Sequence, residues 1–187
     1  MNTNYSKKLM IFIDGSVNTQ SKIGYGAYLA ISELGLSLDL LKGQVKTKKF
    51  EDTSSTKLEL QNLLWVLNTV DIARRQVIIH TDSQNIIGLQ NRRERLERKN
   101  YRSNQNKLLN NHKLYQEFYK LTDTFDCTFV KVKGHKQSSQ KDDIDILFTL
   151  VDRAARDTLR EMENILIPGT RHSITVKKNA KNKNYSY

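Results

Sequence analysis

The feature that most constrains the fold is a run of five apolar residues, Leu9 to Ile13, followed directly by Asp14, Gly15 and Ser16. The run is too short to span a membrane, and its Ile and Phe content favours a strand buried on both faces in the middle of a sheet. Asp14 is expected to end this strand and to face a cleft or a cation, because an unpaired buried charge is costly. The alternative is that Asp14 only opens a turn, since Asp-Gly is a common turn dipeptide.

A second apolar strand, predicted over residues 76–81, also ends in a carboxylate, Asp82. Residues 52–70 lie between the two strands and combine hydroxyl side chains suited to an N-cap with leucines at helical spacing. The order strand–helix–strand predicts a parallel pair with a right-handed crossover. The two aspartates then meet at one edge of the sheet, where their like charges are costly unless a metal ion neutralises them.

The remaining elements follow from composition and apolar spacing. Three further segments are predicted strands, the second of them weaker and partly exposed: 23–33, 43–50 and 127–132. A hairpin turn around Leu34 and Gly35 is expected to pair the first strand of the chain, Leu9 to Ile13, with the second, over 23–33. Apolar residues at helical spacing predict two more helices, over 110–124 and from Ile144 to Met162.

The chain is strongly basic, with a formal net charge of +11 over 187 residues. This excess of positive charge indicates a polyanionic partner and favours nucleic acid over a membrane surface. Residues 92–107 hold seven Lys or Arg against two Glu. The segment is either a solvated helix with Arg–Glu pairs or a surface that binds phosphates, for which Arg92, Arg93 and Arg95 are the candidates.

Length and cysteine content set further bounds. We expect one domain over residues 1–166, followed by a basic and flexible tail over 167–187 that adheres to nucleic acid or is simply a soluble end. The single cysteine, Cys127, excludes an internal disulfide and a thiolate metal site, which fits a reducing compartment and predicts a cytoplasmic protein. No signal peptide or membrane-spanning helix is predicted, so no membrane partner is expected.

Five short motifs occur along the chain: Ile-Asp14-Gly-Ser, Lys-Leu-Glu59-Leu, His-Thr-Asp82-Ser-Gln, Lys-Gly-His135 and Val-Asp152-Arg-Ala-Ala-Arg. In type and order they resemble type 1 ribonuclease H, from about residue 8 to residue 160. The resemblance implies an α/β protein of the ribonuclease H-like fold, with a five-stranded mixed sheet, its first three strands antiparallel, and helices on both faces. It also implies a monomer whose catalytic residues are Asp14, Glu59, Asp82, Asp152 and, on a loop beside them, His135.

The implied activity is hydrolysis of the RNA strand of RNA–DNA hybrids, leaving 5′-phosphate and 3′-hydroxyl ends. Two Mg²⁺ ions about 3.5–4 Å apart would activate the water and stabilise the leaving oxygen, and Mn²⁺ is a possible substitute. Mg²⁺ prefers hard oxygen ligands, which explains a cluster of carboxylates. Asp14 is expected to bridge both ions, with Glu59 and Asp82 on one side and Asp152 on the other. His135 would assist proton transfer or product release.

Substrate choice follows from the 2′-hydroxyl groups that an RNA strand displays in a wide, shallow minor groove. The resemblance implies that Ser55, Thr56 and Gln84 face that groove and that Ser54 lies near a phosphate. Ser16, the last residue of the first motif, is a further candidate for substrate binding. This chain differs here from many relatives, which have asparagines before the glutamate that corresponds to Glu59, where this chain has Ser55 and Thr56.

The segment 136–149 is longer than in the short-loop bacterial enzymes. Within it Asp145 lies seven residues before Asp152, on the same helix face, where it would either compete for the second metal ion or serve as a capping or solvated acid.

Two other function classes are compatible with this fold. One is a non-catalytic nucleic-acid-binding domain, which would have no need for all four acids. The other is a different nuclease or a strand-transfer enzyme, such as a resolvase or transposase core. The Lys-Gly-His135 and Thr-Asp82-Ser-Gln motifs favour the ribonuclease.

Overall fold

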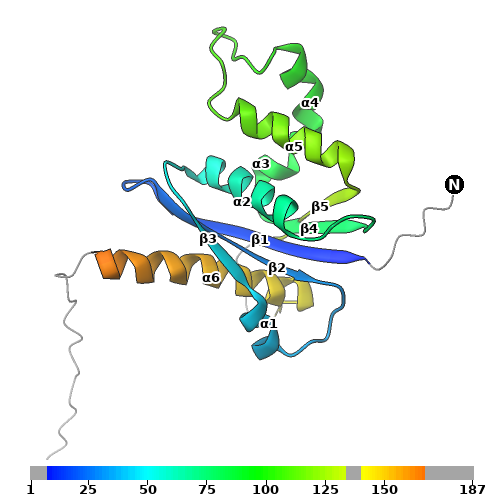
Figure 1. The fold of residues 1–187 in the computed structure, drawn as a ribbon, viewed down its shortest axis with the longest axis vertical. Helices are drawn as coiled ribbons and strands as arrows, with labels where there is room; N and C mark the ends of the chain where they lie inside the picture. Colours follow the sequence, from blue (N-terminus) through cyan, green and yellow to red (C-terminus); the bar gives the residue numbers. More distant parts are fainter. Residues whose placement is uncertain (1–7, 134–139, 167–187) are drawn as a thin grey trace, which may run out of the picture.

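A five-stranded mixed sheet forms the centre of the protein in a computed structural model that describes residues 8–133 and 140–166 (Figure 1). The strands are β1 (Leu9–Asn18), β2 (Ile23–Ile31), β3 (Lys46–Phe50), β4 (Val77–Thr81) and β5 (Cys127–Lys131). They lie in the order β3-β2-β1-β4-β5. The first three strands are antiparallel, whereas β1, β4 and β5 run parallel. The predicted sheet is thereby confirmed.

Strand β1 is the central strand and separates two hydrophobic cores. Leu9, Ile11 and Ile13 contribute to one core, whereas Phe12 contributes to the other. Successive side chains of a strand point to opposite faces, so a continuous apolar run is what a strand covered on both sides requires. The same alternation places the Asp14 side chain on the face of Phe12.

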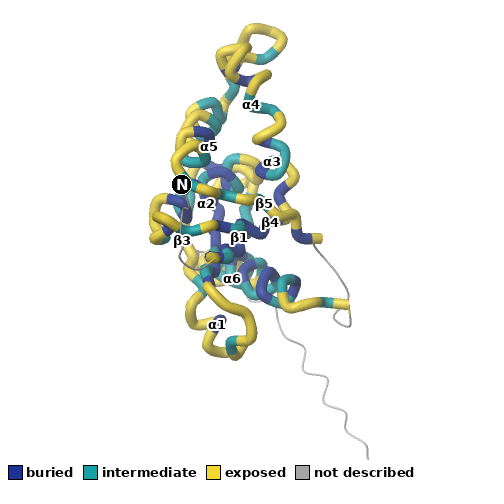
Figure 2. Tube along the Cα trace, turned by 90° about the vertical axis from the view of Figure 1, so that its right-hand side faces the viewer, coloured by how far each residue is buried: buried dark blue, intermediate teal, exposed yellow. Residues whose placement is uncertain are grey.

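Helices cover both faces of the sheet (Figure 1). Four lie on the side of Ile11 and Ile13: α2 (Ser55–Thr69), α3 (Gln84–Ile87), α4 (Leu89–Arg98) and α5 (His112–Thr124). Two lie on the side of Phe12: α1 (Leu38–Gln44) and α6 (Asp143–Leu166). Figure 2 shows the buried residues concentrated where β1, α2 and α6 meet, while the chain around α4 and α1 is largely exposed. None of the described helices is long and apolar enough to cross a membrane.

Three predictions about local structure were wrong. Asp14 does not end its strand, because β1 continues to Asn18 by pairing with β2 as far as Ile23. The turn between these strands therefore lies at residues 19–22 and not at Leu34 and Gly35. The third strand is shorter than predicted, since α1 occupies residues 38–44, and the N-cap signal of this helix, Ser37, was missed.

The start of α6 resolves the two possibilities for Asp145 in favour of helix capping. Asp145 donates its backbone N–H to Oδ1 of Asp142 at 2.9 Å, and its own Oδ2 accepts the backbone N–H of Asp142 at 3.1 Å. This reciprocal pair is a capping box, which satisfies two backbone donors at the helix start. Asp145 is 5% exposed and occupied in this structural role.

The capping box gives a stability prediction. Asp142→Ala removes the side-chain acceptor for the Asp145 N–H, and we expect it to lower the free energy of unfolding by about 1 kcal/mol. Asp143→Ala is the matched control, because Asp143 is the exposed neighbour at the first helical residue and makes no capping bond among the described residues. Denaturant unfolding of both variants measures the difference, and equal stability of the two would contradict the capping role.

Candidate active site

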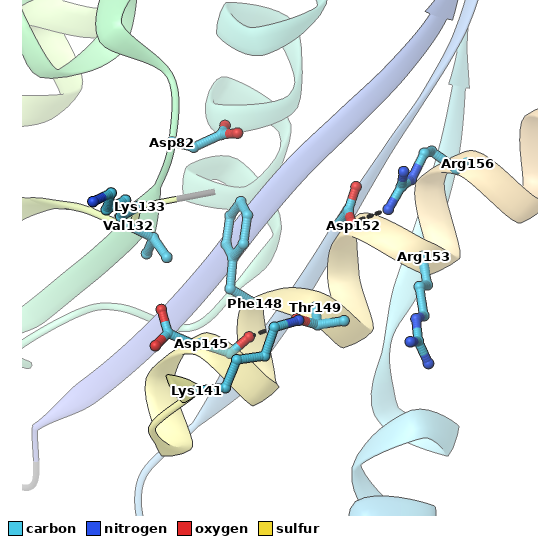
Figure 3. Close-up of a pocket in the computed structure, with 10 residues that line it drawn as sticks. All are labelled: Asp82, Val132, Lys133, Lys141, Asp145, Phe148, Thr149, Asp152, Arg153 and Arg156. Atoms are coloured by element: carbon cyan, nitrogen blue, oxygen red, sulfur yellow. Dashed lines mark hydrogen bonds and ion pairs between the residues drawn. The ribbon is translucent and has the colours of Figure 1, made fainter. Parts of the chain in front are cut away.

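Four elements bring the candidate carboxylates together. Asp14 lies in β1 and Asp82 directly follows β4, the parallel neighbour of β1. Glu59 lies in the second turn of α2, and Asp14, Glu59 and Asp82 line one small pocket. Asp152 lies on α6 and shares with Asp82 an adjoining pocket of about 280 Å³ (Figure 3). Residues from both faces of the sheet therefore meet at one site.

Burial and neighbouring negative charges oppose the ionisation of Asp14. Burial, followed by the negative charge of Asp82, raises the pKa of Asp14 to about 8. The backbone N–H of Gly15 acts in the opposite direction by hydrogen bonding to the carboxylate, and Asp152 raises the pKa further. Among the described carboxylates with a shifted pKa, Asp14 is therefore the one whose charged form the fold disfavours most.

Glu59 is held in place by Ser83, a residue that the sequence analysis did not identify as functional. The Ser83 hydroxyl donates to Oε2 of Glu59 at 2.7 Å and accepts the backbone N–H of Ile86 at 3.1 Å, so it also caps α3. Burial raises the pKa of Glu59, the Ser83 hydrogen bond lowers it, and the charge of Asp82 raises it. Glu59 is thus a half-buried member of the cluster and not a solvated surface glutamate.

Asp152 has a cationic partner one turn along α6. Its Oδ2 accepts a hydrogen bond from Nη2 of Arg156, as Figure 3 shows. The spacing of four residues in Val-Asp152-Arg-Ala-Ala-Arg156 is the signal that predicts such a pair on a helix. The ion pair holds the Asp152 carboxylate beside Arg156 on α6.

The donor set fits a divalent cation. Carboxylate oxygens are the hard ligands that Mg²⁺ prefers, and a cation would relieve the repulsion that raises the pKa of Asp14. Within the described residues, no group of three or more His, Cys, Asp or Glu side chains is arranged to hold an ion as it stands.

The hydroxyl candidates lie at the N-terminus of α2. Ser54 is the N-cap residue, and its Oγ accepts the backbone N–H of Lys57 at 3.4 Å. Ser55 and Thr56 follow in the first turn and are exposed. All three residues lie within five positions of Glu59, at the same end of α2.

Gln84 and Ser16 lie on two other sides of the cluster. Gln84 is exposed at the first residue of α3 and accepts a hydrogen bond from the Lys131 side chain. Ser16 is half-buried in β1 and lines a polar pocket between this strand and α6, of about 400 Å³.

The three candidate arginines of α4 differ in their surroundings. Arg92 is used inside the protein: its Nη2 donates to Oδ1 of Asn85 at 2.8 Å, and its Nε donates to the carbonyl of Gly88 at 3.1 Å. These bonds tie α4 to the end of α3. Arg95, in contrast, is exposed, and its guanidinium has no hydrogen-bond or ion-pair partner within the described ranges.

Arg93 also has internal partners. Its guanidinium pairs with Glu97 at 2.8 Å and with Asp123 of α5 at 2.8 Å, and it lies over the ring of Tyr119. Arg93 thereby links α4 to α5, whereas Arg95 is the arginine of this set that is open to a phosphate.

Some candidates fall outside the described residues. His135, the predicted proton-transfer residue, is one of them, as are the first residues of the enlarged segment 136–149 and the predicted tail over 167–187.

Comparisons with known proteins identify a family and a similar fold. The family model described as RNase H matches residues 6–158. A similar solved structure is a chain of the foamy viral protease-reverse transcriptase in complex with dsDNA, with a TM-score of 0.55 and 9% sequence identity. The match covers 83% of this chain and 97% of that chain, and at this identity it establishes the fold alone. No curated protein matches the sequence.

Proposed function

The chain belongs to the RNase H family, and from this premise we propose that it is an endoribonuclease that hydrolyses the RNA strand of RNA–DNA hybrids. The observation that carries the proposal is the convergence of four carboxylates on two adjoining pockets: Asp14, Glu59 and Asp82 line one, and Asp82 and Asp152 line the other. Binding alone would not require like charges to be brought together at this cost. The expected location, a reducing cytoplasmic compartment, rests on the lone Cys127 and belongs to the same proposal.

Asp14, Glu59, Asp82 and Asp152 would hold the metal ions, with Mg²⁺ the first candidate and Mn²⁺ a substitute. When bound, two such ions supply an activated water and stabilise the leaving 3′-oxygen, which gives 5′-phosphate and 3′-hydroxyl ends. The protein contributes orientation: Ser83 fixes the Glu59 carboxylate, and Arg156 fixes that of Asp152. Asp14 must lose its proton to act as a ligand, which the raised pKa opposes near neutral pH.

Recognition of the hybrid is proposed to come from side chains around the cluster. Ser55, Thr56 and Gln84 are exposed and carry the donors and acceptors that a 2′-hydroxyl group needs. Ser54 and Ser16 flank them on α2 and β1. Because only RNA has the 2′-hydroxyl, these contacts would select the RNA strand, and basic side chains would position the duplex without reading its sequence.

A panel of labelled duplexes tests the proposal. RNA–DNA hybrid, double-stranded RNA and double-stranded DNA of one sequence are incubated with the protein in Mg²⁺ or in chelator. We expect cutting of the hybrid in Mg²⁺ and none in chelator. Equal cutting of double-stranded DNA would instead indicate one of the other nuclease or strand-transfer classes.

The arginines of α4 give a quantitative prediction about binding. Arg95→Gln should weaken hybrid binding and reduce the slope of log K against log salt by about 0.7–0.9, because about one fewer counterion is released. Its thermal stability should stay within about 0.5 kcal/mol of the wild type, since Arg95 is exposed.

Arg93→Gln is the matched control, since Arg93 is engaged with Glu97 and Asp123. It should change stability more and the salt slope less than Arg95→Gln does. Fluorescence anisotropy at several salt concentrations measures both slopes. An unchanged slope for Arg95→Gln would assign α4 to the solvated-helix alternative.

A further inference from the structure

Asn62 is a buried polar residue beside the acidic cluster that the motifs do not include. It lies in α2, one turn after Glu59, and is 1% exposed. It also lines the small pocket that Asp14, Glu59 and Asp82 share. A buried amide among leucines is costly unless it is hydrogen-bonded, so its contacts indicate what it does.

The Asn62 side chain bonds to the backbone of the central carboxylate residue. Its Nδ2 donates to the carbonyl oxygen of Asp14 at 2.8 Å and to that of Ala27 at 3.1 Å. Asp14 and Ala27 are directly opposite each other in β1 and β2. One amide from α2 therefore connects both strands at the level of the acidic cluster.

This contact lies just beyond the end of the ladder between β1 and β4. The ladder between β1 and β4 runs from Leu9 to Phe12, so Asp14 lies two residues beyond its last pair. By alternation along β1, the Asp14 side chain points to the α6 face. Asn62 approaches the Asp14 carbonyl from α2, on the opposite face, and thereby leaves the carboxylate free to face the cluster.

The fit around Asn62 is tight. A Cβ atom added to Gly26 would lie 2.4 Å from Oδ1 of Asn62, far closer than a real Cβ contact. The absence of a side chain at Gly26 is therefore what admits the amide. Oδ1 itself is buried and accepts no hydrogen bond within the described part of the chain. A buried oxygen without a hydrogen bond lowers stability, so stabilisation of the core alone does not explain an asparagine at this position.

We propose that Asn62 is a positioning residue: it fixes the Asp14 peptide relative to Glu59, so that the two carboxylates can bind one divalent cation. The role rests on the proposed function, because it concerns the metal ions of that site. Residues that orient metal ligands typically change metal affinity or activity by about 10–100-fold when removed.

Asn62→Leu tests the role, because leucine has nearly the same size and cannot donate to the Asp14 carbonyl. We expect the half-saturating Mg²⁺ concentration for hybrid cleavage to rise about tenfold and kcat to fall about tenfold or more. KM for the hybrid should change little, since Asn62 is only 1% exposed and offers almost no surface for contact with a duplex. The rise in melting temperature on adding Mg²⁺, which needs no cleavage, should shrink. Asn62→Ser has a side chain too short to reach both carbonyls and should show the same changes in Mg²⁺ dependence and kcat. Because serine is smaller than asparagine, this variant also shows whether overpacking by leucine causes the effect.

Val66→Ala is the control for a purely structural effect. Val66 lies one turn further along α2, is 0% exposed and packs in the same core as Ile11 and Ile13. Its loss should lower stability while leaving the Mg²⁺ response unchanged. If Asn62→Leu and Asn62→Ser keep the wild-type Mg²⁺ response and kcat, the positioning role is wrong although the proposed function stands. If the wild type itself neither responds to Mg²⁺ nor cuts the hybrid, both are wrong.

Discussion

Asp14→Asn should reduce hydrolysis of the RNA–DNA hybrid by at least about 10³-fold while hybrid affinity changes less than about threefold. Asparagine keeps the size of the side chain and removes its charge. The loss should be large because the charges of both Asp82 and Asp152 act on Asp14, which is the carboxylate proposed to contact both ions. Affinity should persist because the basic surface, and not the cluster, provides most of the attraction to phosphates.

Asp157→Asn is the matched control for that result. Asp157 lies on α6 and is exposed, with Arg160 3.7 Å away as its partner. It therefore carries the same charge outside the cluster, and its replacement should leave cleavage near the wild-type rate. Single-turnover cleavage and anisotropy binding measure the two quantities separately. Near-normal cleavage by Asp14→Asn would show that Asp14 has only a structural role in β1.

The second large effect concerns stability without metal. Folding raises the pKa of Asp14 from 3.8 to about 8, mainly through burial. The folded state then binds the Asp14 proton more tightly than the unfolded chain does. Stability from this group is present below about pH 4 and is lost progressively as the pH rises towards 8. Above that range Asp14 carries a constant penalty, which a bound cation would relieve because it binds the folded chain.

Asp14→Asn should remove this penalty. In chelator at pH 8 we expect the variant to be more stable than the wild type by about 2 kcal/mol or more, or roughly 4–8 °C in melting temperature for a chain of this size. The difference should vanish near pH 4, and the variant should gain less from Mg²⁺. Thermal melts at both pH values, with and without Mg²⁺, give the comparison. A variant that melts lower than the wild type at pH 8 in chelator would mean that the Asp14 charge has a stabilising protein partner.

Much of this arrangement follows from short-range patterns in the sequence. The uninterrupted run from Leu9 to Ile13 predicts a strand covered on both faces, and two hydrophobic cores meet on β1. The parallel pairing of β1 with β4, which brings Asp14 near Asp82, follows from the strand–helix–strand order. Such features are predictable because they depend on apolar periodicity and connection handedness.

Other features depend on contacts between segments far apart in the chain. Ser83 has the sequence of a helix cap, yet its second partner is Glu59, 24 residues away. In the sequence, Asn62 resembles an ordinary polar residue of a helix. Its partner, the Asp14 carbonyl, is 48 residues away in the chain and reaches Asn62 only in the folded sheet. Arg92 and Arg95 cannot be told apart by charge alone, since only packing against α3 occupies the first and leaves the second exposed.

The most direct measurement uses one RNA–DNA hybrid with a different label on each strand, incubated with the protein in Mg²⁺ or in chelator. The proposed reaction predicts that Mg²⁺ produces internal cuts in the RNA strand alone, and that the fragments carry 5′-phosphate and 3′-hydroxyl ends. Cutting of the DNA strand, cutting in chelator, or fragments with 2′,3′-cyclic phosphate ends would contradict it, because the last of these requires attack by the RNA's own 2′-hydroxyl and no metal-activated water.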